Sequence, residues 1–180
     1  LPAAKPRHAV TTSRAAFQNV ELSRQVTDGL KALGKQTGVT LFMSLLAAFD
    51  VLLYRYGGQT DLPIGTPIAN RNRLGREALI GFFINTLVLR MDLSGDPTFI
   101  EVLQRVRDVS LDAYAHQAMP FEKLVEELQP DRGLAHSPLF NVMFVLHNME
   151  TDALELPGLS LSFSQQDNKT SRFDLLLTMW

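Results

Sequence analysis

The sequence of 180 residues contains no cysteine and has no marked excess of one charge. Without cysteine, the chain can form neither disulfide bonds nor thiolate metal sites, and it has no cysteine nucleophile. Its 17 basic and 19 acidic residues give a net charge of −2, which provides no electrostatic attraction to nucleic acids or anionic membranes. The longest apolar stretch, residues 41–54, contains Ser44 and Asp50 and is too short to cross a bilayer. We therefore expect a cytoplasmic protein that binds neither nucleic acid nor membrane.

The motifs of several common active sites are also missing. The four histidines, His8, His116, His136 and His147, have no second histidine three or four residues away and no carboxylate cluster beside them, so no metal site is expected. The chain contains no Gly-x-Ser-x-Gly nucleophile elbow and no glycine-rich phosphate loop. Residue chemistry alone therefore names no reaction.

What is present is the composition of a folded globular domain, with 46% hydrophobic and 20% charged residues. Residues 1–14 are rich in proline and basic side chains and are interpreted as a linker. Apolar residues at helical spacing predict a helix over residues 21–35. A second helix is predicted over residues 40–55 with Thr40 as its cap, and because it is apolar nearly all round, it is expected to be buried.

The rest of the chain combines strands with two further helices. Residues 82–93 form a long run that is apolar on both sides, which predicts a strand covered on both faces. Asp96 is the predicted cap of a helix that ends near Ala115. Further strands are expected at residues 61–69, 139–146, 159–164 and 173–177, and a further helix from residue 120. This order predicts an α/β or α+β fold with a mixed β-sheet packed with helices.

Two polar residues stand out against this pattern. Asn85 lies inside an apolar strand, where a buried amide needs hydrogen-bond partners. It either bonds to neighbouring backbone, the simpler interpretation, or reaches into a cavity. His116 is expected at the end of a helix, where the helix dipole favours a histidine whatever its function.

Two charged groups have equally simple structural interpretations. Arg71, Arg73 and Arg76 lie in one polar loop, and a solvated surface loop would explain all three. Asp174 lies between Phe173 and Leu175 in an apolar strand. Buried carboxylates are normally paired, and Arg172 is the expected ionic partner.

Four segments resemble, in order, the motifs of one enzyme family. They are Gly81-Phe-Phe-Ile-Asn-Thr-Leu-Val-Leu-Arg90, His116-Gln-Ala-Met-Pro-Phe-Glu-Lys-Leu-Val125, His136-Ser-Pro-Leu-Phe-Asn-Val-Met-Phe144 and Arg172-Phe-Asp-Leu175. The segment Ile64-Gly-Thr-Pro-Ile-Ala-Asn-Arg71 resembles the one that precedes them in the family. Each motif alone is weak, but together they cover most of the chain. The chain therefore resembles the condensation domains of nonribosomal peptide synthetases.

The resemblance implies a chloramphenicol acetyltransferase-like fold of two lobes with a tunnel between them. Two carrier proteins bring their substrates as phosphopantetheine thioesters, and no cofactor binds the domain directly. The family's catalytic His-His-x-x-x-Asp-Gly motif lies in the N-terminal lobe, and no two histidines are adjacent in this chain. Residues 15–180 are accordingly identified with the C-terminal lobe, without the catalytic lobe and without the last strand and helix of the family. No catalytic residue and no metal ligand is expected here, and the chain alone is expected to be inactive.

The resemblance also implies roles for individual residues. The candidate tunnel residues are His116, Asn85, Gln117 and Ser137; the candidate carrier-docking residues are Arg71, Arg73 and Arg76; Arg172 and Asp174 form the expected structural ion pair. The implied partners are peptidyl carrier domains, the N-terminal lobe and the adenylation domain of the same synthetase. Two alternatives stay open: a stand-alone, non-catalytic module that binds carrier proteins, and a lobe of a related epimerisation or heterocyclisation domain.

Overall fold

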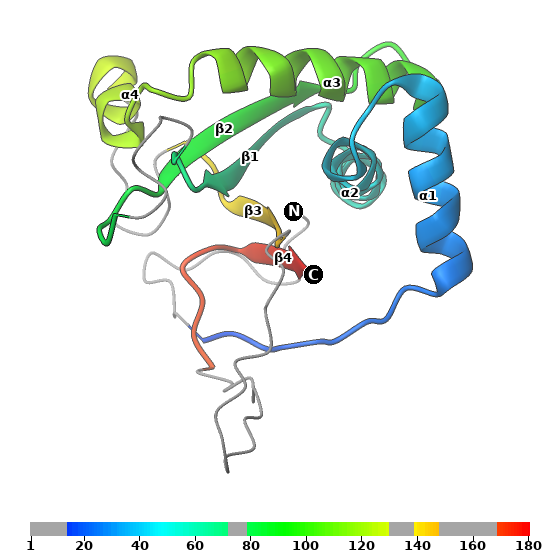
Figure 1. The fold of residues 1–180 in the computed structure, drawn as a ribbon, viewed down its shortest axis with the longest axis horizontal. Coiled ribbons are helices and arrows are strands. Elements are labelled where there is room, and N and C mark those ends of the chain that lie inside the picture. The colour runs from blue at the N-terminus through cyan, green and yellow to red at the C-terminus, as the bar shows by residue number, and fades with distance from the viewer. Residues whose placement is uncertain (1–13, 72–78, 130–138, 148–168) are drawn as a thin grey trace.

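A computed structural model of the chain describes residues 14–71, 79–129, 139–147 and 169–180. The elements, in chain order, are α1 (Arg24–Thr37), α2 (Leu41–Gly57), β1 (Asp61–Ile68), β2 (Asn85–Asp92), α3 (Phe99–Ala115), α4 (Phe121–Leu128), β3 (Val142–Leu146) and β4 (Leu175–Met179) (Figure 1). The predicted order of helices and strands is confirmed for these elements. The strand predicted at 159–164 and nearly all of the predicted linker lie outside the described residues.

Helix α2 begins directly after Thr40, as predicted, whereas α1 covers Arg24–Thr37 rather than the predicted residues 21–35. The Thr40 side chain accepts a hydrogen bond of 3.2 Å from the backbone N–H of Met43, which caps α2. The helix is followed by its C-cap residue, Gly58, whose φ of 68° is left-handed and is adopted most easily by glycine. Ser23 caps α1 in the same way as Thr40 caps α2.

The third helix begins two residues later than predicted. Its cap is Thr98, whose side chain and backbone form a reciprocal capping box with Glu101. The predicted cap, Asp96, instead has a φ of 49° and lies in the turn that precedes the helix. The prediction that Asp96 caps this helix is therefore wrong.

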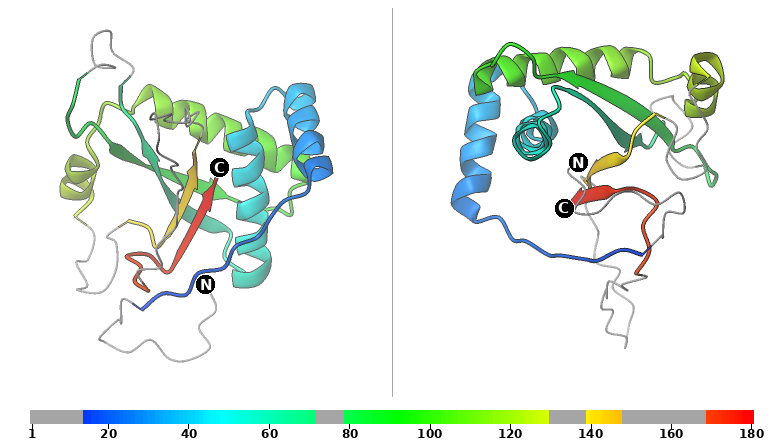
Figure 2. Two further views of the ribbon diagram at one scale, coloured as in Figure 1. Left: turned by 60° about the horizontal axis from the view of Figure 1, so that its bottom comes forward. Right: turned by 180° about the vertical axis from the view of Figure 1, so that it is seen from behind.

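The four strands form one mixed sheet in the order β2-β1-β3-β4 (Figures 1 and 2). β1 and β2 pair antiparallel along their whole length, from Asp61 opposite Asp92 to Ile68 opposite Asn85. β1 and β3 pair parallel, as do β3 and β4. The predicted fold class, a mixed sheet packed with helices, is confirmed.

The core lies between one face of this sheet and helices α2 and α3. Residues of β2 alternate, with Leu87, Leu89 and Met91 buried on this face. The rings of Phe42 and Phe49 on α2 pack on the fully buried Phe144 of β3, with centroids 5.3 and 5.9 Å apart. Figure 1 shows α2 and α3 over the sheet and α1 outside α2.

The second face of the sheet is less covered than predicted. Along β2, the alternate residues Thr86 and Val88 are half-buried and Arg90 is exposed. On β4, Leu176 is 46% exposed. Within the described segments, the expectation that residues 82–93 are covered on both faces is therefore wrong, because both helices that pack closely on the sheet use the same face.

Candidate functional site

Residues from different motif-like segments contact one another in the folded chain. These segments supply the end of β1, most of β2, the turn between α3 and α4, and the residues that lead into β3 and β4. Three phenylalanines from three of these segments form one stack. The ring of Phe140 lies 5.7 Å from that of Phe121 and 5.6 Å from that of Phe173. Residues far apart in the sequence thus share one cluster, which we call the aromatic stack.

The Phe140 ring of the aromatic stack packs directly against Gly65 of β1. By strand alternation, a side chain at position 65 would point to the face opposite Ile64, away from α2 and α3. A Cβ atom at Gly65 would overlap the ring of Phe140, with Cδ2 only 2.7 Å away and two ring atoms closer still. Phe140 itself is 4% exposed. Glycine is therefore required here by close packing rather than by backbone conformation. An isolated glycine inside a strand pattern is a sequence signal for such an approach.

Asn85 is the first residue of β2, and its side-chain hydrogen bonds are all with backbone groups. Its Nδ2 donates hydrogen bonds to the carbonyl oxygens of Gln117, at 3.1 Å, and Met119, at 2.8 Å. Its Oδ1 accepts a hydrogen bond of 3.0 Å from the N–H of Phe121. Of the two interpretations of Asn85, the structure shows the one in which the amide bonds to neighbouring backbone. The amide joins the sheet to the turn between α3 and α4.

His116 and Gln117 lie in that turn. His116 is the C-terminal cap residue of α3, and its Nδ1 lies 2.9 Å from the carbonyl oxygen of Asp112. Its side chain is 77% exposed. The Nε2 of Gln117 donates a hydrogen bond of 2.8 Å to the carbonyl oxygen of Tyr114. The structure thus brings three of the four candidate tunnel residues, Asn85, His116 and Gln117, into one region. The fourth, Ser137, lies outside the described residues.

Of the three candidate docking arginines, the structure describes Arg71. Its guanidinium donates hydrogen bonds to the carbonyl oxygens of Leu79, at 2.7 Å, and Gly81, at 3.5 Å. It also lies 4.7 Å from the centre of the Phe83 ring, a cation–π contact. Arg71 therefore contacts residues on the other side of positions 72–78 in the sequence. Arg73 and Arg76 lie outside the described residues.

The predicted pair of Arg172 and Asp174 lies just before β4. Both residues are exposed, and the ion pairs among the described residues do not include one between them. The backbone N–H of Asp174 donates a hydrogen bond of 2.9 Å to the carbonyl oxygen of Asn141. This bond fixes the segment that carries Phe173 beside the segment that carries Phe140. An ionic role for the pair stays a prediction.

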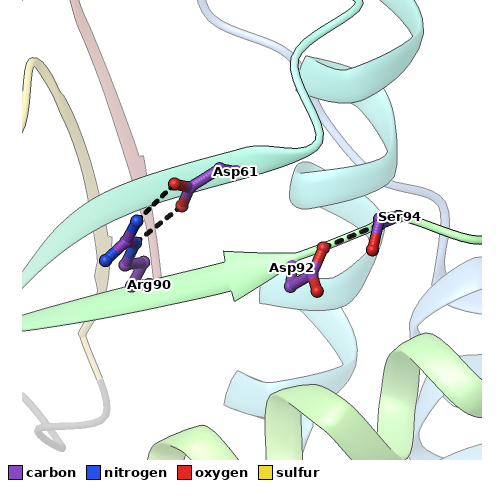
Figure 3. Close-up of polar contacts among 4 residues, drawn as sticks. All are labelled: Asp61, Arg90, Asp92 and Ser94. Carbon is purple, nitrogen blue, oxygen red and sulfur yellow. Dashed lines mark hydrogen bonds and ion pairs between the residues drawn. The ribbon is translucent and has the colours of Figure 1, made fainter.

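Another arginine of the family motifs does form an ion pair. Arg90 donates to both carboxylate oxygens of Asp61 across the β1–β2 ladder, at 2.8 and 2.6 Å (Figure 3). These hydrogen bonds hold the pKa of Asp61 below its usual value. Asp92, next to this pair, accepts a hydrogen bond from the N–H of Ser94, which lowers the pKa of Asp92. The pair aligns the two strands, and it was not predicted because strand register cannot be read from the sequence.

A further carboxyl group lies in the core without a partner. Asp50 is on α2, fully buried, and neither of its carboxylate oxygens has a hydrogen-bond partner. Burial raises its pKa well above the usual value, because the charged form loses its hydration. Burial therefore favours the neutral form of this carboxyl. Full burial also keeps it from contact with a substrate.

Metal binding and membrane insertion find little support in the described segments. No group of three or more His, Cys, Asp or Glu residues there has the arrangement of a metal site. No single helix there is long and apolar enough to cross a membrane, whereas α1 and α2 together, bent by 106°, meet that test by length and composition only.

Comparison with known proteins gives the family of the chain. The family model described as condensation domain matches residues 1–180. The chain belongs to this family. It is 54% identical, over 99% of its length, to one of the proteins that make up the linear gramicidin synthase of Brevibacillus parabrevis, of which it covers 4%. It is 47% identical, over its whole length, to the malpinin synthetase of Mortierella alpina, of which it covers 2%. The resemblance inferred from the motifs is therefore confirmed.

Solved structures of condensation-type domains show the same fold. The X-domain from teicoplanin biosynthesis, in its complex with OxyB, matches 98% of the chain with a TM-score of 0.85 and 34% identity. The condensation domain of the Monacolin K polyketide synthase MokA matches 71% with a TM-score of 0.65 and 29% identity. The chain covers 38% and 30% of these two structures, respectively. It thus corresponds to a part of each.

Proposed function

We propose that the chain is the C-terminal lobe of a nonribosomal peptide synthetase condensation domain and helps to form an amide bond between two carrier-bound substrates. The acceptor amine nitrogen bonds to the carbonyl carbon of the donor thioester. The carbon–sulfur bond breaks, the donor carrier keeps its phosphopantetheine as a free thiol, and the amine loses a proton. The partners are peptidyl carrier domains, the N-terminal lobe and an adenylation domain of the same synthetase.

The observation that supports this proposal is the contact between residues of different motif-like segments. His116, Gln117 and Asn85 lie together, and Asn85 bonds to the backbone of Phe121, a member of the aromatic stack. Such an arrangement suits a wall that holds substrates in place. Holding two tethered substrates in the correct geometry raises their effective concentration and accounts for much of the acceleration in reactions of this kind. The proton acceptor is assigned to the N-terminal lobe, because this chain lacks the His-His-x-x-x-Asp-Gly motif.

Carrier docking is assigned to Arg71, Arg73 and Arg76. Arg71 contacts Leu79, Gly81 and Phe83, which follow residues 72–78 in the sequence. Arg73 and Arg76 are close to it in the sequence and are assigned to the same docking surface. Helix α4 is a less suitable surface for an acidic carrier, because it carries Glu122, Glu126 and Glu127 against one lysine, and like charges repel.

The test is amide formation between two aminoacyl-loaded carrier proteins. It is run with this chain alone, with a separately expressed N-terminal lobe alone, and with the two together. Product in the mixture only supports a substrate-holding lobe whose chemistry requires the other lobe. Product from this chain alone contradicts the proposal and makes His116 the first residue to substitute.

A second candidate, a non-catalytic module that binds other proteins, is favoured by one comparison. The X-domain that matches 98% of the chain is found in a complex with OxyB, so this fold also supports protein binding. Carrier binding without product, from the mixture of folded lobes, would support this candidate. The same mixture thus separates the two functions.

A further inference from the structure

We propose that Asn85 is a positioning residue, which fixes the turn between α3 and α4 for carrier-bound substrates. This inference rests on the proposed function, because it assigns the turn containing His116 and Gln117 to the wall of the substrate tunnel. In this view Asn85 does not contact substrate. It acts through the backbone of residues 117–121.

The Asn85 side chain forms hydrogen bonds with three backbone groups at once. Two donor hydrogens meet two carbonyl oxygens, Gln117 and Met119, and one acceptor oxygen meets the N–H of Phe121. The three partners span the whole turn and include the first residue of α4. Asn85 itself is 9% exposed and lies opposite Ile68 in the β1–β2 ladder. A side chain fixed in the sheet thus sets the position of an exposed turn.

The turn has few other attachments to the core. Ala118, Met119 and Pro120 are exposed, and α4 contains no fully buried residue. Pro120, the cap residue of α4, makes no side-chain cap hydrogen bond. The second attachment is Phe121, whose ring contacts Phe140 in the aromatic stack. Loss of the Asn85 bonds therefore leaves the turn held mainly by its two helix ends and one ring.

Only an amide of this length satisfies all three groups. In Asn85→Asp the shape is kept, but the ionised carboxylate has no hydrogens to donate and faces two carbonyl oxygens. Such a change loosens the turn without removing side-chain volume. A displacement of about 1 Å remote from the reacting atoms can lower activity by roughly 100-fold.

The experiment compares the full-length protein with its Asn85→Asp and Thr40→Ala variants. Thr40→Ala is the matched control, because it removes the cap of α2 and destabilises the domain without touching the turn. Amide formation from two loaded carriers gives kcat and KM, and backbone hydrogen exchange of residues 116–121 reports the turn directly. For Asn85→Asp we expect a loss in kcat/KM of roughly 10- to 100-fold, together with faster exchange confined to the turn. For Thr40→Ala we expect no such loss in kcat/KM and no faster exchange in the turn.

The outcomes separate the inference from the proposed function. Equal activity losses in the two variants, or unchanged exchange at 116–121 in Asn85→Asp, would overturn the positioning role. Asn85→Ser, which keeps one donor and one acceptor, is expected to fall between wild type and Asn85→Asp if the side chain acts through these bonds. If the wild-type protein forms no amide at all, the proposed function fails, and the exchange data still decide whether Asn85 holds the turn.

Discussion

Replacement of Gly65 by alanine tests the packing of the aromatic stack. The added methyl group would meet the Phe140 ring with Cδ2 at 2.7 Å, whereas ordinary contacts are 3.4–4 Å. The ring cannot retreat freely, because it is buried and has the Phe121 and Phe173 rings at 5.7 and 5.6 Å. Overpacking of this kind costs about 1–3 kcal/mol.

Part of this cost is offset in the unfolded state. Alanine restricts the unfolded chain more than glycine does, which favours folding by about 0.4–1 kcal/mol where the native backbone suits both residues. We therefore expect Gly65→Ala to lower the free energy of unfolding by roughly 0–2.6 kcal/mol. The assay is urea unfolding of the 180-residue chain, followed by circular dichroism.

The control is Gly29→Ala on helix α1, where an added Cβ has no neighbour within 4 Å. That change should raise the free energy of unfolding by about 0.5–1 kcal/mol, because alanine is the better helix former. Combining Gly65→Ala with Phe140→Leu should give a smaller loss than the sum of the two single changes, since the smaller side chain relieves the overlap. A Gly65→Ala chain as stable as Gly29→Ala, or strict additivity with Phe140→Leu, would refute the packing argument.

Two other substitutions test buried polarity and helix capping. Asp50→Leu should raise the free energy of unfolding at pH 7 by about 1–3 kcal/mol, the usual cost of an unpartnered buried polar group. Because burial raises the folded pKa of Asp50, its contribution to stability should be greatest below the unfolded pKa and should be lost as pH rises through the folded pKa. This part of the pH dependence should be missing in Asp50→Asn. Urea unfolding of both proteins at several pH values measures the difference, and identical pH profiles would contradict the assignment. Thr98→Ala should lower the free energy of unfolding by about 1 kcal/mol. Asp96→Asn should leave the free energy of unfolding unchanged, because asparagine tolerates the left-handed backbone. A larger loss of stability in Asp96→Asn than in Thr98→Ala would restore Asp96 as the cap.

The sequence predicted the elements well where local chemistry decides them. Thr40 and the glycine after α2 set that helix because a cap and a left-handed residue act on their immediate neighbours. Asp96-Pro97 is an equally good local signal, yet it was wrong, because the turn places Asp96 in a left-handed conformation and leaves Thr98 to cap. Two competing caps two residues apart are distinguished by the preceding turn, which the local pattern does not specify.

The candidate site was predicted only in part. Motif order indicated that Asn85, His116 and Gln117 belong together, but the hydrogen bonds of Asn85 depend on where the α3–α4 turn packs against β2. The contacts of Phe121, Phe140 and Phe173 depend on three segments that meet only in the folded chain. In the sequence, these residues are indistinguishable from ordinary core phenylalanines.

The sheet order also has a consequence for synthesis on the ribosome. β1 pairs with β2 as soon as that neighbouring strand has emerged, but its other edge pairs with β3, where Ile64 lies opposite Val142. The edge of β1 therefore stays open while α3, α4 and the connecting residues are made, and an open strand edge can pair with another chain. Non-local parallel pairing is also slow to form. Conditions that slow translation between β2 and β3 should thus increase aggregation of the nascent chain more than a pause of equal length after β4.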